Sequence, residues 1–514
     1  MLPPKLQELL NQRSYHSALP LAESLYALSP SCTSAFRSLL SVYFHCNLYH
    51  SVITLLDKVP DSLDHELLYF KIASLYKLSK HSEVIELNSS DLPASILLII
   101  GKSLFHLNFS SRAAQVLSQA LSKDPLQLEC LDLIFYNHLL PRDQFSSLLA
   151  SLIPFYNSQL PFFSTICKSR IPLPFGSCSV LSSFGDTSQN QMIGPKSWQY
   201  LTTGFPSVCS FLTESLINFD WLSSSSQSAI PLSHCLFLSG DFDSLILLSC
   251  YFERISPNSS IHLLISSLVS ILKEVTGDKP LEEDVSKLEN YICNNTSLTT
   301  ESFALNMVLA HYYVARNQFD CAQTQFKYCH ATFPGSILPI LCLISLYLQS
   351  GVLGYAERFI NIASKIDEND LRLFNEKGVY LASIGKLKEA KRVFLSCLEL
   401  FSDDLLILSA PYSPLKTPFG NGNLVVQLKL SVLSNLALIC VRLGEFTIAK
   451  NMAETCLLLN PNDEPCLLVL GLAHHYLSNL MDAIDCYQKY LSKVPNNYLA
   501  IQLLKLATEE ATSL

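Results

Sequence analysis

Small residues recur along this chain at a constant interval of 34 positions, and this spacing limits the fold more than any other feature. Alanine stands at Ala322, Ala356 and Ala390, and again at Ala449 and Ala483. The gap of 59 residues between Ala390 and Ala449 equals one interval plus a 25-residue insertion. A second, mostly small position keeps the same spacing at Ala310, Ile344, Gly378, Ala437 and Gly471. A mostly larger residue follows each alanine by four positions, at Phe326, Ile360, Phe394, Ala453 and Tyr487.

This outline predicts a helix–turn–helix unit that stacks on its neighbours. Small side chains are needed where two helices cross closely, the larger residue one turn later fills the gap, and a late proline ends the second helix. Pro334, Pro461 and Pro495 supply that proline in three of the five units. A unit of 34 residues with these positions is the tetratricopeptide repeat. We therefore predict an all-α tetratricopeptide superhelical solenoid, with two arrays and about ten to thirteen helix pairs.

The rhythm divides the chain into four segments. Residues 1–158 repeat more loosely, with Tyr15 and Tyr49 spaced by 34 and a clear unit around Gly101, and they form a predicted N-terminal array. Residues 159–230 carry the Ser, Pro and Gly density of an irregular linker with some helix. Residues 231–302 are predicted to hold degenerate repeats. Residues 303–514 form the C-terminal array, interrupted by an insertion over 405–430.

Composition restricts the kind of partner. Charged residues make up 15% of the chain, against about 25% in ordinary soluble proteins. Partners are therefore expected to cover much of the surface. The alternative is a compositional bias of the source genome. The net charge of −9 comes without a Lys/Arg cluster, which argues against nucleic acid. The start of the chain lacks the apolar core of a signal peptide, and no apolar run reaches the ~20 residues of a membrane span. These features predict an intracellular protein.

The sequence shows no arrangement of residues for catalysis, a cofactor or a metal. The 17 cysteines include no Cys-x-x-Cys pair. Cys329, Cys397 and Cys456 all follow a repeat alanine by seven residues, where a small buried side chain is expected, so structural packing is the favoured interpretation. No phosphate-binding Gly loop, nucleophile elbow or zinc-protease motif occurs. A catalytic base at His474 or His475 would have no nucleophile or second acid at a suitable spacing.

A solenoid of this kind instead offers a concave groove lined by the first helix of each pair. The residues beside the buried stripe of those helices are candidates to contact a bound polypeptide, although a solvated helix surface is the plain alternative for any one of them. These groove candidates are Leu341, Ser345, Arg372, Asn375, Val379, Ser434, Leu438 and His475.

The insertion contains two candidate phosphorylation sites. Ser413 begins a Ser-Pro-x-Lys pattern typical of cyclin-dependent kinase substrates, and Thr417 precedes Pro418. A phosphate there would add about −1.5 to −2 charges to an exposed loop. Turn formation by the prolines alone is an equally good interpretation.

The stretch from Tyr355 to Leu400 is more specific than a generic repeat. Its Ala356-Glu357-Arg358-Phe359 and Glu376-Lys377-Gly378-Val379 segments resemble the cell division cycle protein 16 family, which are tetratricopeptide subunits of the anaphase-promoting complex. The lengthened repeat and the opening helices also resemble that family. The central segment 160–230 does not, and the polar tail usual in the family is missing after the last repeat.

This resemblance implies a scaffold subunit of a ubiquitin ligase acting in mitosis, in the nucleus and cytoplasm, and not an enzyme. It implies homodimerisation through the N-terminal repeats and a C-terminal groove that holds a small partner similar to cell division cycle protein 26. The alternative is another scaffold: a sister subunit, or an intraflagellar-transport or chaperone adaptor. A chaperone adaptor would need a basic clamp, and this groove has Arg372 without matching Lys or Arg residues on neighbouring first helices.

Overall fold

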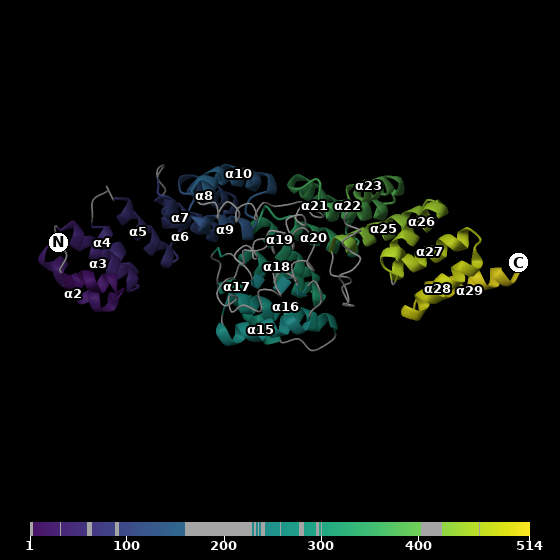
Figure 1. Cartoon of the computed structure of the whole chain (residues 1–514), viewed down its shortest axis with the longest axis horizontal. Coiled ribbons are helices and arrows are strands. Elements are labelled where there is room, and N and C mark those ends of the chain that lie inside the picture. Colours follow the sequence, from purple (N-terminus) through teal and green to yellow (C-terminus); the bar gives the residue numbers. More distant parts are fainter. Residues whose placement is uncertain are drawn as a thin grey trace.

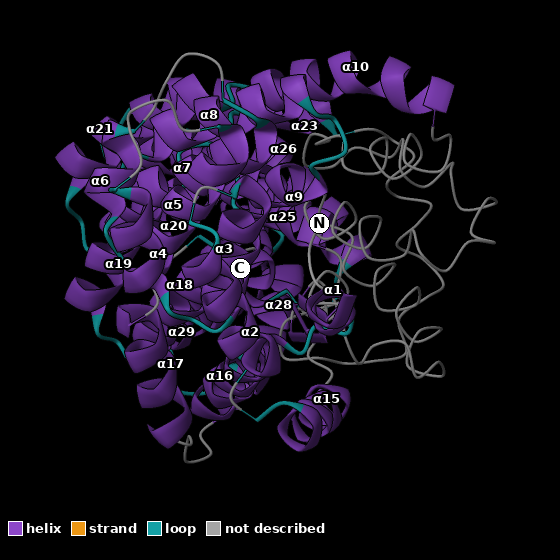
Figure 2. Ribbon diagram, turned by 90° about the vertical axis from the view of Figure 1, so that its left-hand side faces the viewer, coloured by secondary structure: helices purple, strands orange, loops and turns teal. Residues whose placement is uncertain are grey.

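In the computed structural model of the chain, the described residues form helices joined by loops. The described residues are 4–30, 32–58, 64–87, 92–159, 229–230, 233–234, 236–237, 242–257, 259–276, 282–294, 298–299, 301–401, 424–461 and 463–513. Over these ranges there are helices and loops but no strand (Figure 2). Most of the predicted linker and insertion lies outside them, including Ser413 and Thr417, and the predicted segment boundaries stay predictions.

The helices succeed one another along an elongated body whose two termini lie at opposite ends (Figure 1). The first ten are α1 (Pro4–Asn11), α2 (Tyr15–Leu28), α3 (Thr33–His45), α4 (Tyr49–Leu56), α5 (His65–Lys77), α6 (His81–Glu86), α7 (Ala94–His106), α8 (Ser110–Lys123), α9 (Leu128–Tyr136) and α10 (Arg142–Gln159). The remainder are α15 (Phe242–Ile255), α16 (Ser260–Thr276), α17 (Glu282–Asn294), α18 (Ser302–Ala315), α19 (Phe319–Thr332), α20 (Leu338–Gln349), α21 (Leu353–Ile366), α22 (Leu371–Ser383), α23 (Leu387–Leu400), α25 (Leu424–Arg442), α26 (Phe446–Leu459), α27 (Glu464–Tyr476), α28 (Leu480–Lys493) and α29 (Tyr498–Ser513).

Ten of the described helix pairs are closed by one turn residue in the left-handed backbone region. Such a residue ends the first helix and lets the chain reverse within a few positions. Among the described residues these are Arg13, Asn47, Ser79, Asn108, His138, Asn317, Gly351, Gly385, Gly444 and Ser478. From Asn317 onward they keep the interval of 34 residues, apart from the insertion. The ten turns mark ten helix pairs, which confirms the all-α tetratricopeptide solenoid.

The small and large positions of the repeat meet inside each pair. Ala322, Ala356, Ala390, Ala449 and Ala483 are all completely buried. Glycine faces an aromatic ring in two pairs, Gly378 against Phe394 and Gly471 against Tyr487, so closely that no Cβ would fit. Because the crossing helices touch here, the spacing of the small residues sets the stacking of the whole array.

The residues after α9 pack directly onto the residues at the start of α18 and after α19. The Asn137 amide donates to the Thr299 carbonyl at 2.7 Å, and its oxygen accepts the Phe303 N–H at 2.9 Å. The Gly335 N–H donates to the His138 carbonyl at 2.8 Å. α15, α16 and α17 lie to one side of this junction, with α16 packed on α18 (Figure 1). The end of α9 and the start of α18 are therefore bonded directly to each other, although Asn137 and Thr299 are 162 positions apart in sequence.

None of the described helices combines the length and apolarity that crossing a membrane requires.

Candidate functional site

The best-defined polar site on the first helices of the C-terminal array lies where α20, α22 and α25 adjoin. We call it the groove cluster: Cys342, Arg372, Asn375, Glu376 and Asn435. The Asn435 amide donates to the Asn375 side-chain oxygen at 3.1 Å, across 60 residues of sequence. The Asn375 amide donates to Glu376 Oε1 at 3.3 Å. These bonds place side-chain amides and a carboxyl group side by side on successive first helices.

Arg372 is held by its own helix cap. Asp370 caps α22, and its carboxylate accepts from Arg372 through Nε at 3.0 Å and Nη2 at 2.5 Å. Burial alone would raise the pKa of Asp370, but the Arg372 charge and hydrogen bonds outweigh it and leave the pKa below its ordinary value. The Arg372 side chain keeps 25% of its surface exposed, so a partner would meet a paired guanidinium.

Glu376 has an unusual environment for a carboxyl group. Burial raises its pKa to about 7, and the Asn375 hydrogen bond opposes that rise only in part. Burial likewise raises the pKa of the Cys342 thiol to about 12. The groove cluster therefore carries one charge pair, one carboxyl that is partly neutral near pH 7, and amides able both to donate and to accept.

The structure separates the remaining groove candidates. Leu341 is buried in a core cluster with Ile344 and Ile360, whereas Leu438 on α25 is 44% exposed. Ser345 and Val379 are half-buried on α20 and α22. Ser434, also half-buried, has its hydroxyl beside the Cys466 thiol.

His475 is engaged from two sides. Its Nδ1 lies 3.4 Å from the Tyr487 hydroxyl and its Nε2 lies 3.1 Å from Glu510 Oε2 on α29. The neighbouring His474 is buried, with Nδ1 3.6 Å from Asp482. Within the described part of the chain, neither histidine has a nucleophile among these contacts.

Three members of the groove cluster were not predicted from the sequence. Asn435 is an isolated amide within the apolar stretch "VLSNLALIC", and that contrast is the signal that could have found it. Glu376 and Cys342 gave no such signal, because their proximity to Arg372 depends on how α20 and α22 stack.

Comparison with known proteins gives consistent results. The tetratricopeptide repeat family matches residues 430–463, which form the unit after the insertion. The chain is 27% identical over 225 residues to "Anaphase-promoting complex subunit CDC16" of Saccharomyces cerevisiae, covering 44% of this chain but only 25% of the yeast protein. It is 23% identical over 454 residues to "Anaphase-promoting complex subunit 6" of Arabidopsis thaliana, covering 82% of this chain and 79% of that protein.

The resemblance to the cell division cycle protein 16 family is thereby confirmed. The mouse "Cell division cycle protein 16 homolog" is 21% identical, with 82% of this chain and 64% of the mouse protein aligned. In fold, the chain matches a solved structure described as "APC/C hetero-tetramer Cut9-Hcn1" with a TM-score of 0.68 and 19% identity, over 98% of this chain and 95% of that one. The likeness in fold to that solved structure therefore covers nearly the whole length of both chains.

Proposed function

We propose that this chain is a non-catalytic scaffold subunit of an anaphase-promoting complex, an E3 ubiquitin ligase that controls the cell cycle in the nucleus and cytoplasm. The observation that carries the proposal is the alignment with Arabidopsis anaphase-promoting complex subunit 6 over 82% of this chain. The groove cluster supports a binding role, since its side chains offer hydrogen bonds but no catalytic arrangement.

The decisive experiment is affinity purification of the tagged full-length chain from dividing cells of its source. Recovery of a cullin-like subunit and a RING subunit is the expected outcome. Recovery of transport or chaperone proteins without those two would favour the alternative, another tetratricopeptide adaptor. The purified chain alone should transfer no ubiquitin.

The C-terminal groove is proposed to hold an extended peptide, supplied by a small partner similar to cell division cycle protein 26. Side-chain amides on successive first helices can pair with the N–H and C=O groups of such a peptide. Losing one of these bonds should weaken binding about three- to tenfold, which is the range for a net hydrogen bond. Asn435→Ala should show this loss in a binding titration with the synthetic peptide.

Asn451→Ala is the matched control for the peptide experiment, because Asn451 is an exposed amide on the second helix α26. Equal weakening by both variants would argue against peptide binding at the groove cluster. No binding of the peptide by the unmodified chain would rule out the small partner but leave the complex itself to the purification experiment.

Homodimerisation through the N-terminal array is the third part of the proposal. Helix α2 presents Leu21 at 43% exposure and Leu28 at 82%, next to an internal cluster that buries Leu6, Ala18 and Ala22. Sedimentation of the full chain should show a dimer, and Leu28→Asp should shift it toward monomer. A strictly monomeric unmodified chain would contradict this part alone.

Regulation at Ser413 and Thr417 stays a prediction, since both lie outside the described residues. Intact-mass and peptide analysis of protein from mitotic cells should detect phosphate within 409–423. An unmodified peptide under those conditions would contradict it.

A further inference from the structure

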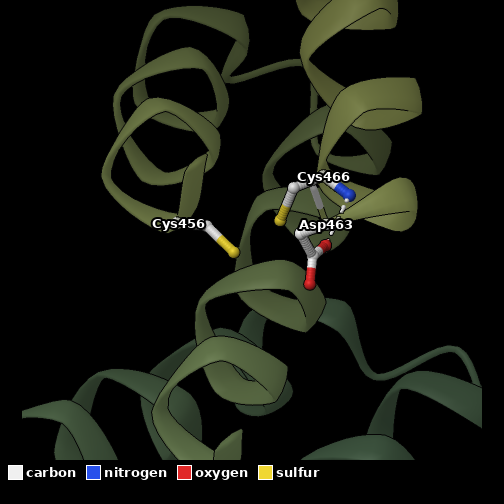
Figure 3. A group of neighbouring side chains, drawn as sticks. All are labelled: Cys456, Asp463 and Cys466. Carbon is white, nitrogen blue, oxygen red and sulfur yellow. Dashed lines mark hydrogen bonds between the residues drawn. The ribbon is translucent and has the colours of Figure 1, made fainter. Parts of the chain in front are cut away.

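Two cysteines and a carboxylate converge where α26 meets α27. The Cys456 and Cys466 sulfurs and an Asp463 carboxylate oxygen all lie within 4.8 Å of one another (Figure 3). Cys456 belongs to the last part of α26, Asp463 caps α27, and Cys466 is the third residue of that helix. Both cysteines are completely buried, and Asp463 is half-buried. The two thiols are thus shielded from solvent, whereas the carboxylate is partly accessible.

The repeat shows that two facing thiols are not required for packing. Cys456 and Cys466 follow the repeat alanine Ala449 by 7 and 17 residues, and the other repeats of the C-terminal array have a residue at each of these two positions. The corresponding pairs are Cys329 with Pro339, Ala363 with Leu373, Cys397 with Val432, and Tyr490 with Ala500. None of these four pairs contains a second thiol, so the packing does not require one. Among these five pairs, only Cys456 and Cys466 combine two thiols.

Cys397 is the closest counterpart of Cys456. Its sulfur contacts the Leu371 carbonyl at 3.6 Å, and the Cys456 sulfur contacts the Leu430 carbonyl at 3.9 Å, in each case 26 residues upstream. Since Val432 corresponds to Cys466 in the repeat, the Cys397 site has one sulfur where the Cys456 site has two. The two sites share their packing and differ in their donors.

The carboxylate also differs from its counterpart. Asp370 occupies the same capping position before α22, where Arg372 neutralises it through two hydrogen bonds. Asp463 uses Oδ1 to accept the Cys466 N–H at 3.0 Å, but Pro465 stands where that arginine would be. Asp463 forms no ion pair within the part of the chain that the structure describes. A negative charge thus lies beside two potential thiolates without a compensating cation.

We propose that Cys456, Cys466 and Asp463 bind a thiophilic divalent cation of the zinc class. Two thiolates and a carboxylate are donors that Zn²⁺ accepts, and tetrahedral Zn–S bonds of about 2.3 Å place two sulfurs about 3.8 Å apart. The Ser434 hydroxyl, next to Cys466, or a water molecule can complete the four ligands. Each cysteine gives up one proton as the cation binds, so two protons are released per ion.

The metal would join the second helix of one repeat to the first helix of the next. Leu398, Leu430 and Met452 surround the two cysteines with apolar contacts, so water is largely kept from the sulfurs. Because both thiols must lose their protons to bind the cation, binding should strengthen as pH rises. The site is independent of the proposed function.

The test is a titration of the reduced, metal-free full chain with Cd²⁺ in the presence of a competing chelator. Binding is monitored through the ultraviolet absorption of the thiolate-to-Cd²⁺ charge transfer. The chelator prevents single cysteines from retaining the ion. The two variants to compare are Cys456→Ala and Cys466→Val. Other units of the array have these residues at the corresponding positions, as Ala363 and Val432, so both variants should fold. One ion per chain should bind to the unmodified protein and be lost in both variants.

Cys397→Ala is the matched control and should bind like the unmodified chain. Asp463→Asn keeps a side chain that caps helices well but removes the charge, and it should weaken Cd²⁺ binding without lowering the melting temperature of the metal-free chain. Zn²⁺ should raise the melting temperature of the unmodified chain and of Cys397→Ala, because it binds only the folded state, and leave Cys466→Val unchanged. X-ray absorption of the Zn²⁺-loaded chain should show two sulfur ligands.

Three results would overturn the proposal. The first is Cd²⁺ absorption that survives Cys466→Val in a folded protein. The second is no uptake by the unmodified chain in competition with the chelator. The third is peptide mapping that finds a Cys456–Cys466 disulfide, with no metal bound after its reduction.

Discussion

Gly378 lies directly against the Phe394 ring, so that a Cβ at Gly378 would stand 2.5 Å from Phe394 Cζ. The two residues are 16 positions apart, and the same separation joins Gly101 to Leu117 and Gly471 to Tyr487. The small position of the first helix thus receives the large residue of the second. The Phe394 ring fills the space that is left because Gly378 has no side chain.

Gly378→Ala should therefore destabilise the protein. Overpacking costs about 1–3 kcal/mol, which exceeds the gain of up to about 1 kcal/mol from replacing a helical glycine. Adding Phe394→Ala creates the Ala–Ala pair found at Ala437 and Ala453, and it should relieve the overpacking so that the two changes are not additive. Urea denaturation of the single and double variants measures this.

The control for this prediction is Gly354→Ala. Gly354 is exposed near the start of α21, and a Cβ there would meet nothing within 4 Å. This change should leave stability unchanged or raise it by about 0.5–1 kcal/mol. A Gly378→Ala variant as stable as Gly354→Ala would contradict the packing argument.

Replacing Asn137 should weaken the junction between the two arrays. Asn137 is completely buried and bridges the Thr299 carbonyl and the Phe303 N–H. Asn137→Ala leaves both backbone groups without this partner, at a cost of about 1–3 kcal/mol for each buried group that stays unsatisfied. Denaturation should show the loss, and limited proteolysis should cut faster near the junction.

The control for Asn137→Ala is Ser147→Ala on α10, where the exposed Ser147 hydroxyl donates to the Gln144 carbonyl of its own helix. That variant should unfold like the unmodified chain. If Asn137→Ala behaves the same way, the junction does not depend on the amide.

Glu376 should make the folded chain less stable as pH rises. Its folded-state pKa of about 7 lies above the ordinary 4.5, because burial disfavours the charged form. Between these values the folded chain binds more protons than the unfolded chain, so its stability falls as pH rises through this window. Glu376→Gln should remove that slope and gain on the order of 1–3 kcal/mol above pH 7, as thermal melting from pH 4.5 to 8 would measure. An unchanged slope would contradict the assignment.

His81 should make the folded chain less stable as pH falls, the opposite of the effect of Glu376. Its ring is buried, no hydrogen-bond partner contacts either nitrogen within the described chain, and it stacks on His106 at 3.8 Å between ring centroids. Burial, and secondarily the nearby His106, lower its pKa from 6.5 to about 4. The unfolded chain therefore binds more protons between pH 4 and 6.5, and stability is lost as pH falls through this window.

His81→Phe should flatten this acid-side slope and make the chain on the order of 1–3 kcal/mol more stable near pH 4 than the unmodified protein. His50→Gln changes an exposed histidine on α4 and should leave the slope in place. Melting temperatures at half-unit steps from pH 4 to 7 distinguish the two. A slope that persists in His81→Phe would assign the acid sensitivity to other groups.

The repeating part of this protein could be predicted from its sequence alone. Ala390, Gly378 and Phe394 interact within one helix pair, and each pair packs mainly on the next, so a fixed spacing of small and large residues is enough to specify the pairs and their stacking. The all-α solenoid and the first-helix placement of the groove candidates follow from this local rule.

Only the tertiary structure decided which distant residues meet. The bond between Asn137 and Thr299 spans 162 residues, and that between Asn435 and Asn375 spans 60 residues across an insertion. Even Cys456 and Cys466, only ten positions apart, showed no metal spacing until the turn between α26 and α27 brought their sulfurs beside Asp463. The physical reason is that the repeat constrains each helix against its neighbours, whereas the curvature of the array and the conformation of each turn determine which side chains converge.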